Sequence, residues 1–109
     1  MRLRHIPGAE ETIAASPYVV QDPQSFKGRF CQLFGNKNPI RIEVGMGKGR
    51  FIMEMAQAHP DVNYIGIERY SSVLLRALQK REGLDLDNIY LMCIDAKTLG
   101  DVFAPGEVD

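Results

Sequence analysis

The chain has 109 residues, enough for one domain with a single core. Hydrophobic residues make up 45% and charged residues 25% of it, which excludes a disordered tail, a collagen-like repeat and a coiled coil. The net charge of −1 gives no overall basic field. However, residues 1–50 hold eight Lys and Arg against four Asp and Glu, whereas residues 51–109 hold five against ten. We therefore expect the N-terminal half to be the part that meets an anion.

The sequence contains no pattern of a membrane span, a secretory signal or a metal site. No apolar run approaches the ~20 residues that a membrane helix needs, and no apolar stretch follows the charged N-terminal residues. Cys31 and Cys93 lie far apart and outside any C-x-x-C pattern, as is typical of reduced cytosolic thiols. The two histidines have no metal-ligand spacing. We predict a cytoplasmic protein without a metal or a membrane partner.

Residues 1–39 are predicted to be an N-terminal extension with short helices. Pro–Gly, Ser–Pro and Asp–Pro dipeptides interrupt its first part, where a short helix fits residues 10–15. Apolar residues at helical spacing predict a second helix over residues 26–34. Gly35 then takes the position where helices often end in a left-handed residue, and turn-forming residues 36–39 follow.

Residues 40–109 alternate between strand and helix patterns. Three strands are predicted from β-branched and alternating apolar residues: 40–44, 61–68 and 89–94. Two helices and a last helical turn are predicted from apolar residues at helical spacing: 51–59, 71–83 and 97–103. The core stripe expected in the first of these helices consists of Phe51, Ile52, Met55 and Ala56. The order predicts an α/β fold, namely a βαβαβ unit that is half of a doubly wound sheet.

Three carboxylates stand at the carboxyl ends of the predicted strands: Glu43, Glu68 and Asp95. Parallel strands end at one rim of a sheet, and ligands of such sheets bind there. Glu68 is placed to accept hydrogen bonds from ribose hydroxyls, and Asp95 from an adenine amino group beside the Ala96 N–H. Asp95 is also placed to cap the following helix. Arg69 is expected to be an exposed side chain, with stacking over the adenine as the alternative.

A glycine-rich turn follows the first strand, with glycines at positions 45, 47 and 49. Such glycines permit positive φ angles and close approach of a ligand, and the N–H groups that begin the next helix suit an anion. A nicotinamide cofactor favours G-x-G-x-x-G, but here Arg50 stands where the third glycine is required. S-adenosylmethionine fits better, because its ammonium can pair with Glu43 and it carries no phosphates. A nicotinamide-dependent oxidoreductase and a non-catalytic cofactor-binding module remain the alternatives.

Five segments carry a resemblance to a known family. They are Ile42-Glu43-Val44-Gly45-Met46-Gly47-Lys48-Gly49, Phe34-Gly35-Asn36-x-Asn38-Pro39-Ile40, Gly47-Lys48-Gly49-x-Phe51-Ile52, Asn63-Tyr64-Ile65-Gly66-Ile67-Glu68 and Asp95-Ala96-x-Thr98-Leu99. The first resembles the opening motif of class I S-adenosylmethionine-dependent methyltransferases. The others, in order and spacing, resemble the bacterial tRNA (guanine-N7-)-methyltransferase family, and the opening Arg2-x-Arg4-His5 is also similar to it. The resemblance covers essentially the whole chain.

The resemblance implies a Rossmann-like class I methyltransferase fold and S-adenosyl-L-methionine as cofactor, bound by a half-domain at residues 40–109. It also implies methylation of a guanine at N7 in the variable loop of tRNA. The cofactor-binding positions carried over are Glu43, Gly45, Gly47, Gly49, Glu68, Asp95 and Ala96. Contacts with tRNA phosphates are expected from Arg2, Arg4 and His5.

The family's catalytic acidic residue lies on a fourth strand, and the resemblance places that strand after Asp109. No catalytic residue is therefore assigned within this chain, and we expect the 109-residue chain alone to be inactive. The family's strand order puts the first strand beside the fourth. We therefore expect the first strand to have an exposed edge in this chain, through which copies self-associate.

Overall fold

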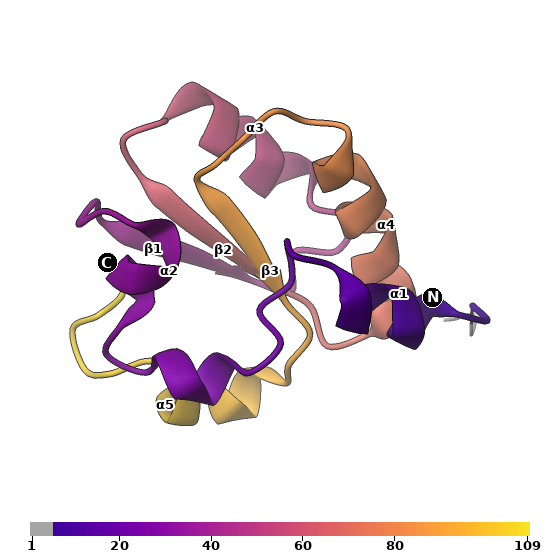
Figure 1. Ribbon diagram of the computed structural model, residues 1–109, viewed down its shortest axis with the longest axis horizontal. Helices are drawn as coiled ribbons and strands as arrows, with labels where there is room; N and C mark the ends of the chain where they lie inside the picture. Colours follow the sequence, from indigo (N-terminus) through magenta and orange to yellow (C-terminus); the bar gives the residue numbers. More distant parts are fainter. Residues whose placement is uncertain (1–5) are drawn as a thin grey trace.

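The structure is a computed structural model that describes residues 6–109 (Figure 1). Its helices and strands follow one another as α1 (Ala9–Ala15), η1 (Pro23–Phe26), α2 (Phe30–Phe34), β1 (Ile40–Val44), α3 (Arg50–Ala58), β2 (Asn63–Ile67), α4 (Ser71–Glu82), β3 (Ile89–Met92), η2 (Ala96–Thr98) and α5 (Leu99–Val102). The predicted alternation of strands and helices from residue 40 onward is confirmed, with boundaries that agree to within two residues and with the last predicted helix divided into η2 and α5.

The three strands form one parallel sheet in the order β1-β2-β3. The middle strand, β2, is buried along its whole length, as expected for a strand covered on both faces. Figure 1 shows α3 and α4 on one face of the sheet, with α1 beside α4, and α2, η1 and α5 on the other face. The βαβαβ arrangement predicted from the sequence is therefore present.

Each face of the sheet has its own core. The core under α3 and α4 is built mainly from Ile13, Val19, Met46, Ile52, Met53, Ala56, Tyr64, Leu74, Leu78, Ile89 and Leu91. The core on the opposite face is built from Val20, Phe30, Ile40, Ile65, Ile67, Met92, Val102 and Phe103. Both cores contain residues from positions 13–30, so the N-terminal extension packs on both faces of the sheet.

The extension also covers the outer edge of β3. Val20 N–H donates to Leu91 O at 2.9 Å, and Leu91 N–H donates to Tyr18 O at 2.9 Å. On the other face, the Glu107 carboxylate accepts the N–H groups of Gly28 at 2.8 Å, Phe30 at 3.1 Å and Ala104 at 2.9 Å. One side chain near the C-terminus therefore fixes the chain around the start of α2.

Two details differ from the sequence-based expectation. The helix predicted over residues 26–34 is broken into η1 and α2, because Gly28 adopts a left-handed φ of +77° between them. Gly35 ends α2 in a left-handed conformation, as predicted. In α3, Phe51 is 62% exposed rather than part of the core, and Met53 is buried in its place. Phe51 projects near the outer strand β1, where no described element covers it.

Two glycines of the turn before α3 separate the effects of backbone conformation and crowding. Gly47 and Gly49 both have positive φ, but a Cβ at Gly49 would lie 3.1 Å from Ala77 Cβ and 3.2 Å from Met53 Cε, whereas one at Gly47 meets nothing within 4 Å. Gly47→Ala should cost about 1–2 kcal/mol of stability for its left-handed backbone. Gly49→Ala should cost about 1–3 kcal/mol more, through overpacking. Urea unfolding measures both, and equal losses would contradict the close approach of α3 to α4.

Candidate functional site

A cavity of about 250 Å³ lies where the three strands end. Val44 and Gly45 line it from the end of β1, Glu68, Arg69 and Tyr70 from the end of β2, and Ile94, Asp95 and Ala96 from beyond β3. Four of the seven cofactor positions predicted from the sequence therefore surround one space: Gly45, Glu68, Asp95 and Ala96. Gly47 and Gly49 lie in the adjacent turn.

The glycine turn folds over the end of β2. Gly45, Gly47 and Gly49 all have positive φ angles, of +70°, +61° and +79°, as the pattern predicts. Gly45 N–H donates to Ile67 O at 2.8 Å, and Met46 N–H donates to the same oxygen at 3.1 Å. A Cβ on the β2 residue Gly66 would lie 2.3 Å from the Met46 sulfur, so the absence of a side chain there lets the turn lie flat on the strand.

Glu68 connects the turn to the start of α4. Its side chain is almost completely buried. Its Oε1 accepts the Gly47 N–H at 3.1 Å, and its Oε2 accepts the Tyr70 N–H at 3.1 Å. Each carboxylate oxygen has two lone pairs, so both can still accept a hydrogen bond from a ligand hydroxyl. The side chain is therefore fixed in position while acceptor capacity remains available.

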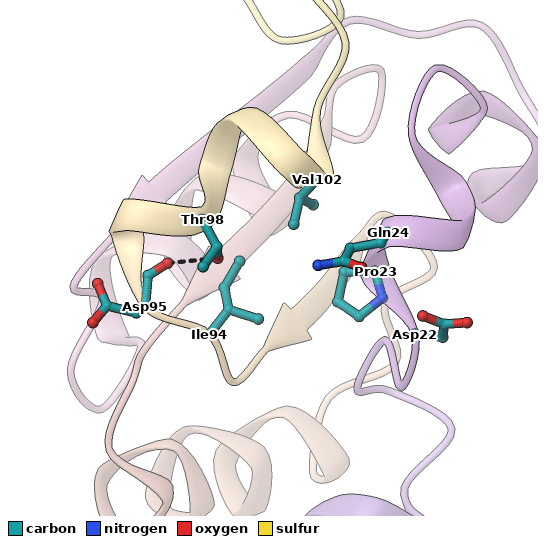
Figure 2. Close-up of a pocket in the computed structure, with 7 residues that line it drawn as sticks. All are labelled: Asp22, Pro23, Gln24, Ile94, Asp95, Thr98 and Val102. Carbon is teal, nitrogen blue, oxygen red and sulfur yellow. Dashed lines mark hydrogen bonds between the residues drawn. The ribbon is translucent and has the colours of Figure 1, made fainter.

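Asp95 both caps a helix and borders the cavity. Its Oδ1 accepts the Lys97 N–H at 3.0 Å, which confirms the expected cap, and its Oδ2 lies 3.9 Å from Arg69 Nη1. The Thr98 hydroxyl donates to the Asp95 carbonyl at 2.8 Å. A second cavity, of about 370 Å³, lies on the other side of this residue against η1. Figure 2 shows the Asp95 carboxylate directed away from Ile94 and Val102, which line that second cavity.

Glu43 lies apart from Glu68 and Asp95. It borders a third cavity, of about 130 Å³, together with Phe51, Met55 and Tyr64 on the α3 side of the sheet. Within the described part of the chain, Glu43 Oε1 and the Tyr64 hydroxyl are buried with no hydrogen-bond partner. Burial raises the pKa of Glu43 above its ordinary value. Of the three acids predicted to share one rim, Glu68 and Asp95 border the same cavity, and Glu43 borders a different one.

The reason lies in the alternation of side chains along a strand. Ile42 packs with the core of the α2 and α5 face, so its neighbour Glu43 points to the face that α3 covers.

Sequence spacing gave no signal for Tyr70, which borders the cavity next to Glu68. The predicted tRNA contacts Arg2, Arg4 and His5 lie outside the described residues.

Comparison with known proteins identifies the family. Residues 37–109 match the model of the family described as "Putative methyltransferase". The chain belongs to this methyltransferase family. It is 58% identical over 109 residues to the tRNA (guanine-N(7)-)-methyltransferase of Lachnoclostridium phytofermentans, covering 100% of this chain and 51% of that protein. It is 50% identical over 109 residues to the enzyme of the same name from Bacillus subtilis, covering 99% and 50%.

The chain spans about half the length of these curated relatives. Among solved structures, it is similar to one titled "Structure of an antibiotic related Methyltransferase", with a TM-score of 0.54 and 23% identity over 64% of this chain and 37% of that one. This similarity confirms the predicted Rossmann-like methyltransferase fold. The family match also confirms the resemblance seen in the sequence, and it overturns the alternative of a nicotinamide-dependent oxidoreductase.

Within residues 6–109, no group of three or more His, Cys, Asp and Glu side chains is placed to hold a metal ion. No helix in this part of the chain is long and apolar enough to span a membrane.

The partly buried carboxyl of Glu43 predicts that its removal raises stability in a pH-dependent way. Because the pKa of Glu43 is raised in the folded chain, ionisation costs stability as the pH rises from the unfolded pKa through the folded one. Glu43→Gln cannot ionise, so we expect a higher melting temperature than the parent near pH 7 and no gain below about pH 4. Thermal unfolding followed by circular dichroism at the two pH values measures this.

Glu54→Gln is the matched control, because Glu54 is an exposed carboxylate of α3 whose Oε1 lies 3.3 Å from Arg50 Nε. Such a surface pair contributes about 0–1 kcal/mol, so this variant should show no gain near pH 7. A Glu43→Gln chain that is less stable than the parent near pH 7 would show that the ionised carboxylate is compensated.

Proposed function

We propose that this chain is the S-adenosyl-L-methionine-binding half of a tRNA (guanine-N7)-methyltransferase. The observation that carries this proposal is the cavity at the strand ends, where Glu68 and Asp95 face one space beside a glycine turn. Two carboxylates in one cavity repel phosphates and favour a cationic nucleoside. The curated relatives with 50–58% identity bear this activity in their names.

In this proposal each cavity residue recognises one part of the cofactor. Glu68 accepts the two ribose hydroxyls through the lone pairs that its backbone partners leave unused. Asp95 accepts the adenine amino group, and the Ala96 N–H donates to a ring nitrogen. The backbone N–H groups in the first turn of α3 donate to the cofactor's carboxylate, because the first turn of a helix has no internal carbonyl acceptors for them.

Glu43 receives the cofactor's ammonium group. A buried, unpartnered carboxylate oxygen is a costly feature without a cation to compensate it. Pairing with an ammonium would lower the pKa of Glu43 again. Glu43 borders a cavity on the α3 side of the sheet. The nearby Gly45 and Gly47 carry no side chains that would block the ammonium from approaching Glu43 along the turn.

When bound, S-adenosylmethionine supplies an activated methyl group to the N7 lone pair of guanine. N7 carries no proton, so the transfer needs alignment more than a base. The residues described above hold the donor in place, and no residue of this chain is assigned to align the guanine. Arg2, Arg4 and His5 are proposed to contact tRNA phosphates, and we place the protein in the cytoplasm with its substrate.

Calorimetric titration with S-adenosylhomocysteine tests the cofactor assignment. We expect the chain to bind it and not NAD, and Glu68→Ala to weaken binding by about 1.5–3 kcal/mol through loss of charged hydrogen bonds. Because Glu68 also holds two loop amides, melting temperatures are measured alongside. Arg76→Ala, on the exposed side of α4, is the control. Binding of NAD alone, or unchanged affinity in Glu68→Ala, would contradict the assignment.

Methyl transfer distinguishes an enzyme half from a non-catalytic module. The 109-residue chain with labelled S-adenosylmethionine and unmodified tRNA should incorporate no methyl groups. A chimera in which the C-terminal half of the Lachnoclostridium relative follows Asp109 should incorporate them at guanine N7. A chimera that binds the cofactor and leaves tRNA unmodified would favour the non-catalytic module.

We also propose that copies of the 109-residue chain associate through the outer edge of β1. Along a parallel strand, the residues that bond one neighbour alternate with those that face away. Pro39 and Gly45 bond β2, so the backbone groups of the residues between them at Ile40, Ile42 and Val44 face outward. Asp109 N–H donates to Ile40 O at 2.8 Å, which leaves Ile42 and Val44 as the open part of this edge. Val44 is 46% exposed. An apolar, exposed strand edge favours pairing with another chain.

Light scattering at increasing protein concentration tests this association. The average molar mass of the parent chain should rise with concentration. Val44→Lys should remain monomeric, because a charged edge opposes pairing. Gln79→Lys adds the same charge on the exposed part of α4 and should behave as the parent. A parent chain that stays monomeric throughout would refute the proposal.

A further inference from the structure

The rim of the cofactor cavity carries an exposed cation stacked on an exposed aromatic ring. The Arg69 guanidinium lies 4.7 Å from the centre of the Tyr70 ring. The Arg69 side chain is 56% exposed, and Tyr70 is 41% exposed. Both residues border the cavity beside Glu68. Tyr70 belongs to neither core, so its ring is accessible at this rim.

Arg69 is only weakly held by its neighbours. Its one carboxylate partner within the described residues, Asp95, is 3.9 Å away, and the side chains of both are largely in solvent. An exposed pair of this length contributes about 0–1 kcal/mol. The guanidinium is therefore available to a ligand on the face that does not contact Tyr70. The Tyr70 backbone is held in place, because its N–H donates to the buried Glu68 carboxylate.

Charge is divided between the two ends of the sheet. The loops at the carboxyl ends expose Lys48, Arg69 and Lys97. Of the two carboxylates at this end, Glu68 is buried, whereas the Asp95 side chain is 43% exposed and accepts the Lys97 N–H. The loops at the opposite end expose Asp61, Asp85 and Asp87 together with the cation Lys37, so their charge is net negative. An anionic partner is therefore attracted to the end that holds the cavity.

We propose that Arg69 and Tyr70 form a stacking surface for an unpaired nucleotide of the RNA substrate, with Lys48 and Lys97 contacting the flanking phosphates. This inference rests on the proposed function in taking RNA as the anion. Unpaired bases stack on aromatic rings and guanidinium planes, whereas paired bases present only their edges and backbone. The surface therefore selects a single-stranded segment and holds it at the mouth of the methyl-donor cavity.

Fluorescence polarisation with the 109-residue chain tests the surface. The probes are a fluorescein-labelled single-stranded oligoribonucleotide and the same strand annealed to its complement. The parent should prefer the single strand. Arg69→Ala with Tyr70→Ala should weaken single-strand binding about tenfold or more and leave duplex binding nearly unchanged. Tyr70→Phe keeps the ring and should bind as the parent, and Arg76→Ala controls for loss of one exposed cation.

Lys48→Ala and Lys97→Ala should act differently. Each should weaken both probes alike and lower the slope of log affinity against log salt by about 0.7 on the single strand, as expected for the loss of one phosphate contact. Melting temperatures of all variants establish that they fold. A parent chain that binds neither probe would overturn the inference, as would unchanged single-strand affinity in the double variant.

The same variants are titrated with S-adenosylhomocysteine, because Arg69 and Tyr70 also line the cofactor cavity. In the double variant the affinity for RNA should fall further than the affinity for S-adenosylhomocysteine. If cofactor affinity falls while RNA binding is retained, the pair stacks on the cofactor's adenine and the RNA surface is wrong. If the parent binds RNA through this pair and binds no S-adenosylhomocysteine, the proposed function fails while this inference stands.

Discussion

The Glu68 carboxylate is the constraint on which the geometry of the cavity depends. Two loops that are distant in sequence, the glycine turn and the start of α4, each give one backbone N–H to it. Because the carboxylate is buried, losing either donor would leave charge uncompensated, so the two loops are held at a fixed separation. Gly45 of the turn and Tyr70 at the start of α4 both line the cavity. A single side chain thus shapes the space in which it is proposed to bind a ribose.

Glu43 differs from Glu68 in the hydrogen-bond partners of its carboxylate oxygens. Glu68 receives two N–H groups, whereas one oxygen of Glu43 is buried without a partner in the described chain. A group that lowers the stability of the unliganded fold and has no structural partner is characteristic of a functional site. The nearby Tyr64 hydroxyl is also unpartnered and borders the same cavity. The two strand-end acids therefore play different parts: Glu68 builds the site, and Glu43 remains available to a cation.

The sequence was sufficient for the strand and helix order and for the rim on which Glu68 and Asp95 meet, because side-chain periodicity and strand direction determine both. It was insufficient for Glu43, since a strand end specifies a rim but the face depends on which neighbour is buried. The break at Gly28 escaped prediction because apolar spacing across residues 26–34 is helical, and only the left-handed glycine interrupts it. Phe51 was expected in the core because hydrophobicity carries no information about which elements cover a helix face.

Acidic side chains line the cavity and basic side chains surround its mouth, because acidic and basic residues stand close together in the sequence at two strand ends. Glu68 is followed directly by Arg69, and Asp95 is followed two residues later by Lys97. At these strand ends Glu68 is buried in the cavity wall, whereas Arg69 is exposed at the cavity mouth and Lys97 is exposed beside it. The acid can therefore select a cationic nucleoside while the base attracts a polyanion to the same opening. Two ligands of opposite charge can therefore occupy adjacent positions without competing, as the proposed methyl transfer requires.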